Sequence, residues 1–82
     1  MESLKKKIFR NLSPYEARLI ATKHDMTIVP WLCGKLQMGL TESQAEALAH
    51  DIAEQIESWD CGTSLDNYRW YLRYRLPSNY YE

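Results

Sequence analysis

The sequence predicts an all-α domain, a small bundle of four to five short helices packed on a central amphipathic helix at about residues 42–59. The first observation is that residues 41–59 place their apolar side chains on one face at about 100° per residue. These side chains are Ala45, Leu48, Ala49, Ile52, Ala53, Ile56 and Trp59. The second is that three other segments begin with helix-capping residues. The third is the length of 82 residues, which suffices for a single domain, 1–82.

Composition excludes several classes of protein. The apolar fraction of 45% and the charged fraction of 26% are ordinary for a soluble globular domain. No run approaches the roughly 18 apolar residues that a membrane-spanning helix needs, so we expect no membrane partner. Residues 1–12 are too charged for a signal peptide. We therefore expect a cytoplasmic protein in which Cys33 and Cys61 are free thiols.

The charges are segregated along the chain, although the net charge is only −1. Residues 1–40 hold seven Lys/Arg and three Asp/Glu, residues 41–62 hold six Asp/Glu and no Lys/Arg, and residues 63–82 hold three Arg and two Asp/Glu. A total near neutrality argues against a dedicated nucleic-acid binder, which usually carries a clear basic excess. A local basic face remains open.

Residues 2–12 are expected to form the first helix, because Leu4, Ile8 and Leu12 recur at intervals of four. The remaining surface of this helix is basic. It carries Lys5, Lys6, Lys7 and Arg10. These cations form either a solvated side of the helix or a contact for an anionic partner.

Ser13, Pro14 and Glu16 predict the start of a second helix, since they supply an N-cap, a first-turn proline and the third residue of a capping box. This helix should run to about His24. Thr27 then caps a third helix, from residue 28 to about residue 38, which Gly39 ends. Its inward-facing residues are expected to be Ile28, Trp31, Leu32, Cys33 and Leu36.

The central helix has the clearest boundaries. Thr41 is a good N-cap, and Gln44 completes a capping box three residues later. Gly62 lies just past the other end, where a left-handed residue is favoured.

The last segment, from Leu65 to Leu76, fits two structures. As a helix it places Leu65, Tyr68, Leu72 and Leu76 on one face. As a strand it alternates aromatic and apolar residues with arginines, but no second strand is visible to pair with it. Helix is therefore preferred, and residues 78–82 are expected to be a mobile tail.

The stretch from Ile20 to Leu36 has the spacing of part of a helix-turn-helix. In that arrangement Asp25 takes the place of the usual turn glycine, and Trp31 is a core position. The second helix exposes only Lys35 and Gln37, whereas reading the major groove needs polar side chains near the helix start. An ordinary turn between two core helices explains the same pattern.

No catalytic or cofactor motif is present, and we expect a protein that is not an enzyme. The soft or borderline metal ligands lie at none of the spacings typical of zinc sites. These ligands are His24, Cys33, His50 and Cys61. Glu46, His50 and Glu54 follow one another at intervals of four on the central helix. One helix face supplies too few ligands for a closed metal site, so no metal is expected.

Two surfaces remain as candidates for protein binding. The first, the acidic stripe, comprises Glu42, Glu46, His50, Glu54 and Glu57 on the central helix. The second, the aromatic–arginine surface, comprises Arg69, Trp70, Arg73 and Tyr74. If the last segment is a helix with its leucines inward, Trp70 and Tyr74 point away from the core, and Trp, Tyr and Arg are enriched at binding hot spots. Alternatively the stripe only solubilises its helix, and the rings belong to an aromatic-rich core.

The sequence favours a small, non-catalytic intracellular protein that binds another protein through these two surfaces, as an accessory, regulatory or inhibitory chain. A homodimer formed through the aromatic–arginine surface is a variant of this prediction. Chains of this size and style are common among proteins of phages and mobile elements, which is an analogy only. The alternative is a helix-turn-helix transcriptional regulator. Its DNA-binding residues would be Lys5, Lys6, Lys7, Lys35 and Gln37.

Overall fold

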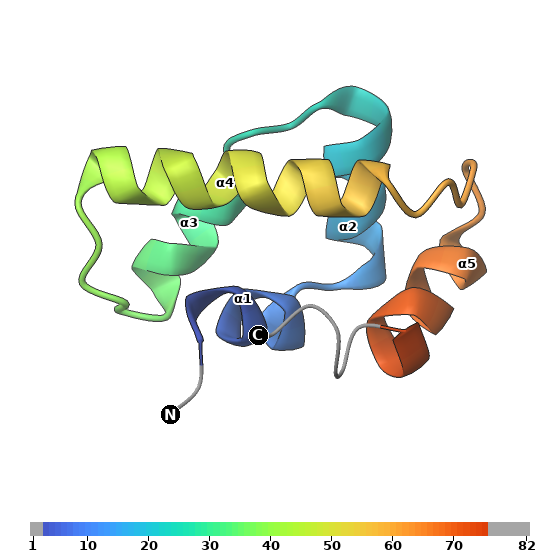
Figure 1. The fold of residues 1–82 in the computed structure, drawn as a ribbon, viewed down its shortest axis with the longest axis horizontal. Coiled ribbons are helices and arrows are strands. Elements are labelled where there is room, and N and C mark those ends of the chain that lie inside the picture. Colours follow the sequence, from blue (N-terminus) through green and yellow to red (C-terminus); the bar gives the residue numbers. More distant parts are fainter. Residues whose placement is uncertain (1–2, 76–82) are drawn as a thin grey trace.

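The computed structural model describes residues 3–75, which form five α-helices and a closing π-helical turn (Figure 1). The helices are α1 (Leu4–Asn11), α2 (Pro14–Lys23), α3 (Ile28–Lys35), α4 (Glu42–Glu57) and α5 (Leu65–Trp70), and the π-helical turn is η1 (Tyr71–Arg75). No strand occurs in this part of the chain, so the all-α prediction is confirmed. The strand alternative for the last segment is wrong over residues 65–75. Leu76 and the expected tail at 78–82 lie outside the described residues.

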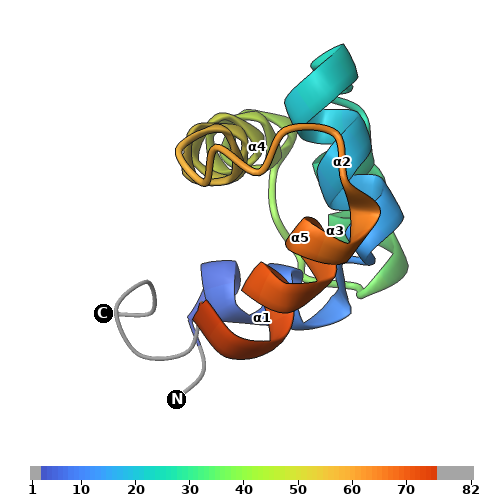
Figure 2. The same ribbon diagram turned by 90° about the vertical axis from the view of Figure 1, so that its right-hand side faces the viewer.

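The other helices pack against or below α4, the longest helix (Figure 1). α3 and α2 both contact α4, α1 packs on α3, and α5 packs on α2. Figure 2 shows α5 beside α2, with α4 seen end-on. Every apolar residue expected on the inner face of the central helix is buried, including Ala45, Ile52 and Trp59. The core therefore forms where the helical periodicity placed it.

Capping boxes fix the starts of the two helices for which the sequence predicted them. At α4 the Gln44 backbone N–H donates to Thr41 Oγ1 at 3.2 Å, and the Thr41 N–H donates to Gln44 Oε1 at 2.9 Å. At α2 the Ser13 hydroxyl and the Glu16 carboxylate make the same reciprocal pair at 3.1 and 3.0 Å. Each box satisfies two backbone N–H groups that a helix start otherwise leaves without a partner.

Replacing Thr41 with alanine is expected to lower the free energy of unfolding by about 1 kcal/mol, because the side-chain acceptor of the α4 cap is lost. Ser43→Ala is the matched control, since Ser43 lies in the same turn, is exposed and makes no side-chain hydrogen bond within residues 3–75. Its effect should stay within about 0.5 kcal/mol. Urea denaturation of both variants measures the difference, and equal midpoints would contradict a contribution from the cap.

Two helix ends differ from the expected ones because residues other than glycine take the left-handed conformation. α3 ends at Lys35 rather than near residue 38, and Gln37 has φ of 52°. The Met38 N–H donates to Cys33 O and the Gln37 N–H to Gly34 O, both at 3.1 Å, which is the hydrogen-bond pattern of a Schellman motif. After α4 it is Asp60 that first takes a positive φ, also 52°. The two glycines expected as terminators take positive φ only further along each loop, at Gly39 and Gly62.

The prediction that Trp31 of α3 faces the core is wrong. This residue is 56% exposed. The buried positions of α3 are Ile28, Val29, Leu32 and Cys33. At about 100° per residue Trp31 points more than a quarter-turn from the centre of that face, and Val29 takes the expected place. The Lys35 Nζ lies 5.1 Å from the Trp31 ring centroid and covers part of its face.

Candidate interaction surfaces

The aromatic–arginine surface lies on α5 and η1 and is exposed. Tyr68 is buried and Leu72 packs against the core, which fixes the inner face of this segment. Trp70 and Tyr74 consequently point outward, with 48% and 64% of their side-chain surfaces exposed. Arg69 and Arg73 are exposed beside them. Of the two alternatives that the sequence leaves open for these rings, an exposed surface or an aromatic-rich core, the structure has the exposed surface.

The exposed rings are held on the core through Tyr71. The Trp70 ring contacts Tyr74 at a centroid distance of 6.1 Å and meets Tyr71 edge-on at 5.4 Å. Tyr71 in turn stacks on Trp59 at 5.1 Å with an interplanar angle of 13°. Trp70 and Tyr74 are therefore held in place through packed aromatic rings. Because their motion is already restricted, binding would cost them less conformational entropy.

The loop between α4 and α5 is fixed by side chains of α5. The Tyr68 hydroxyl donates to Gly62 O at 3.0 Å, and the Asn67 amide donates to Cys61 O at 2.9 Å. Burial raises the pKa of Tyr68, so its phenol stays protonated and able to donate. Arg69 is held by an ion pair with Asp66 at 3.2 Å. These contacts fix the direction in which α5 leaves the end of α4.

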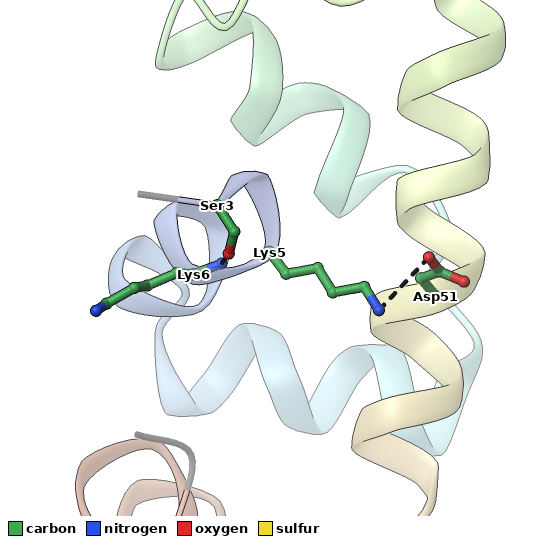
Figure 3. Close-up of polar contacts among 4 residues, drawn as sticks. All are labelled: Ser3, Lys5, Lys6 and Asp51. Carbon is green, nitrogen blue, oxygen red and sulfur yellow. Dashed lines mark hydrogen bonds and ion pairs between the residues drawn. The ribbon is translucent and has the colours of Figure 1, made fainter. Parts of the chain in front are cut away.

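The acidic stripe is exposed along its whole length on α4, but its two ends differ. Glu57, near the helix end, forms an ion pair with His24 between Oε1 and Nδ1 at 3.0 Å. Beside the stripe, Asp51 pairs with Lys5 of α1 at 3.6 Å (Figure 3). Glu42 and Glu46, at the helix start, make no ion pair within residues 3–75.

A groove of about 690 Å³ opens next to that start of α4, between α3 and the 36–41 loop. Its apolar lining includes Met26, Pro30, Cys33, Met38, Leu40 and Ala45. Its polar lining includes Glu42, Glu46 and His50 of the acidic stripe. Sequence reasoning missed this groove, because its walls come from three segments whose proximity no local pattern encodes. The volume lies in the range of sites that take up a ligand or the side chains of a partner.

The residues proposed for DNA binding do not form one basic face. Lys5 points toward Asp51 of α4, whereas the Lys6 side chain extends in the opposite direction (Figure 3). Lys35 lies over the Trp31 ring, and Gln37 lies beyond the end of α3, where it lines the groove. Lys7 of α1 is half-buried.

Thr27 precedes α3 as expected, but its side chain does not cap the helix and instead closes the turn between α2 and α3. Asp25 Oδ1 accepts from the Thr27 hydroxyl at 2.6 Å and from the Thr27 N–H at 3.2 Å. These hydrogen bonds, the hydroxyl first, lower the pKa of Asp25. Trp31, which a helix-turn-helix would bury, is exposed.

Within residues 3–75 no group of three His, Cys, Asp or Glu side chains is arranged to hold a metal ion. The same part of the chain contains no helix that is both long and apolar enough to cross a membrane.

Cys33 and Cys61 are free and buried, and burial raises the pKa of both thiols. Asp60 raises the pKa of Cys61 further. Since the thiolate is the reactive form, we expect both cysteines of the folded protein to react with an aromatic disulfide reagent at least about tenfold more slowly than in urea-unfolded protein at the same pH. Fast reaction of either thiol in the native protein would contradict its burial.

Comparison of the chain with models of protein families, with curated proteins and with solved structures found no significant match.

Proposed function

We propose that this protein is non-catalytic and acts by binding another protein through the aromatic–arginine surface, with the acidic stripe as a second contact. The observation that carries the proposal is the exposure of Trp70 and Tyr74, 48% and 64%, side by side on a helix whose other face is packed. A soluble domain gains nothing in stability from exposing two adjacent large rings. Clusters of this kind, flanked by arginine, are typical of binding hot spots.

The chemistry of these side chains supports a protein partner. Trp and Tyr bury about 150–250 Å² each and lose little rotamer freedom, while Arg69 and Arg73 add hydrogen-bond donors and can stack on planar groups. We place the protein inside the cell, as an accessory, regulatory or inhibitory chain of the kind that phages and mobile elements encode. The free thiols of Cys33 and Cys61 support an intracellular setting.

The test is site-specific crosslinking. Photo-reactive benzoylphenylalanine replaces Tyr74 in one sample and Trp31 in the control, which is an equally exposed ring on another helix. The dilute protein is irradiated in extract from the cells that produce it. A single foreign protein crosslinked from position 74 but not from position 31, and lost when Trp70→Ala is added, is the expected result. Identical products from both positions would contradict a specific surface.

The second candidate is DNA binding, and the observation that favours it is the short link between α2, which ends at Lys23, and α3, which begins at Ile28. A fluorescence titration with duplex DNA from low to physiological salt separates the two functions. Binding that falls steeply with salt and weakens on Lys35→Ala and Gln37→Ala would favour DNA recognition. Under the leading proposal no binding occurs even at low salt.

A further inference from the structure

We infer that the aromatic–arginine surface of one copy of this chain docks into the groove beside α3 and α4 of a second copy. The inference rests on the proposed function only in taking the aromatic–arginine surface as a contact surface. The partner is a second copy of the same chain, and the occupant of the groove is the aromatic–arginine surface of that copy.

The groove has the chemistry of a receptor for basic, aromatic side chains. Its apolar lining contains Met26 and Met38, and flexible thioether side chains adapt to rings of different shape. Ala45 of α4 adds a small apolar side chain to the lining. Glu42 and Glu46 also line the groove and are exposed, without an ion pair within residues 3–75. An occupant with apolar rings and flanking cations satisfies both parts of this lining.

The aromatic–arginine surface meets that description in its side chains and its charge. Arg69 in the last turn of α5 and Arg73 in η1 are four residues apart in the sequence and are both exposed beside the rings. Glu42 and Glu46 have the same separation on α4. Arginine–carboxylate pairs with Glu42 and Glu46 can form while the Trp70 and Tyr74 rings enter the apolar part of the groove, and Arg69 then exchanges its exposed pair with Asp66 for one across the contact. Charge pairs of this kind contribute more to register and orientation than to affinity.

A chain cannot fill its own groove in this way, because the two surfaces lie at opposite ends of the molecule. Figure 1 places α5 at one end of α4 and the 36–41 loop at the other. The net charge of −1 means that two copies do not repel each other as wholes, while the segregated charges attract locally. Because the chain carries both the acidic, apolar groove and an exposed surface of complementary charge, we assign a second copy as the occupant.

The contact is heterologous, since a different surface is used on each copy. After one such contact, the first copy keeps a free groove and the second keeps a free aromatic–arginine surface. The wild-type protein should therefore associate with increasing concentration, as a reciprocal dimer where both contacts close between two copies and as longer assemblies where they do not. With two ring anchors and a small contact area, the association is expected to be weak.

Sedimentation velocity from about 10 µM to about 1 mM tests this on the full chain. The wild-type mass should rise well above the monomer mass of 9.7 kDa. A variant lacking the rings, Trp70→Ala with Tyr74→Ala, should stay monomeric, as should a variant with a reversed groove charge, Glu42→Lys with Glu46→Lys. Mixed together, these two variants should form a one-to-one heterodimer and nothing larger, because only one intact surface of each kind remains.

A matched pair on α4 locates the contact. Glu46 lines the groove and Glu54, two turns further on, does not, although both are exposed carboxylates. Glu46→Lys should weaken association at least about tenfold, whereas Glu54→Lys should leave it nearly unchanged. Far-UV circular dichroism confirms that every variant is folded.

A wild-type protein that stays monomeric at about 1 mM would overturn the inference. So would a mixture of the two double variants that stays monomeric, or equal association of Glu46→Lys and Glu54→Lys. The proposed function is judged separately, because crosslinking from position 74 to a foreign protein is done in dilute extract, where self-association is negligible. Either proposal can therefore fail while the other stands.

Discussion

Trp59→Ala is expected to lower the free energy of unfolding by about 3–5 kcal/mol. The Trp59 side chain is only 4% exposed, and its ring contacts those of three residues from other parts of the chain. These are Phe9 of α1 at 6.0 Å, Tyr68 of α5 at 6.3 Å and Tyr71 of η1 at 5.1 Å. Removal of the indole leaves a cavity where the first and last helices meet the end of α4. For a domain of typical stability, about 5–15 kcal/mol, this is a large fraction of the total.

Trp59→Phe separates the loss of packing from the loss of the indole N–H. Trp59 Nε1 is buried and has no hydrogen-bond partner within residues 3–75. Phenylalanine keeps a ring in the cluster and removes this unsatisfied donor, so part of the cost is offset. We expect a loss of about 1–2 kcal/mol for phenylalanine, clearly smaller than that for alanine. Urea denaturation followed by circular dichroism measures both, and a loss below about 1 kcal/mol for alanine would show that the aromatic cluster contributes little.

Helix starts and the buried face of α4 were predictable because both depend on residues close together in the sequence. A capping box needs only a residue and the third one after it, as at Thr41 and Gln44. The face of α4 follows from the helical period over sixteen residues, which is long enough to define one direction. The outward direction of Trp70 followed in the same way once the last segment was taken as a helix.

Helix ends and the orientation of α3 were not predictable from local patterns. Gln37 and Asp60 take the left-handed conformation although a glycine lies two residues beyond each of them. Tertiary packing that holds the loop outweighs the roughly 1 kcal/mol preference for glycine. α3 has only eight residues and is apolar on several sides, so its sequence does not show that Val29 rather than Trp31 faces the core.

The groove and the ion pairs depend on contacts between distant segments. Lys5 and Asp51 belong to the first and fourth helices, and His24 reaches Glu57 from the end of α2. No spacing in the sequence brings such residues together. The acidic stripe was therefore visible as a set of charges, but its division into an internally paired end and an end beside a groove needed the structure.

Trp70→Ala is expected to abolish binding while leaving the fold intact. The Trp70 side chain is 48% exposed and lies at the centre of the aromatic–arginine surface, where truncation of a hot-spot residue costs about 2 kcal/mol or more, a loss of at least about 30-fold in affinity. Because its main ring contacts are with the half-buried Tyr71 and the exposed Tyr74, the free energy of unfolding should change by no more than about 1 kcal/mol.

Trp31→Ala is the matched control for Trp70→Ala. Trp31 is an exposed tryptophan of similar accessibility, 56%, but it lies on α3, under Lys35 and outside the aromatic–arginine surface. Its removal deletes the same apolar area and should leave binding of the crosslinked partner unchanged. If Trp70→Ala unfolds the protein, Trp70 is a structural residue and its exposure is not evidence for a partner. If both variants bind equally well, exposure of an indole alone does not identify the contact, and a different surface carries the function.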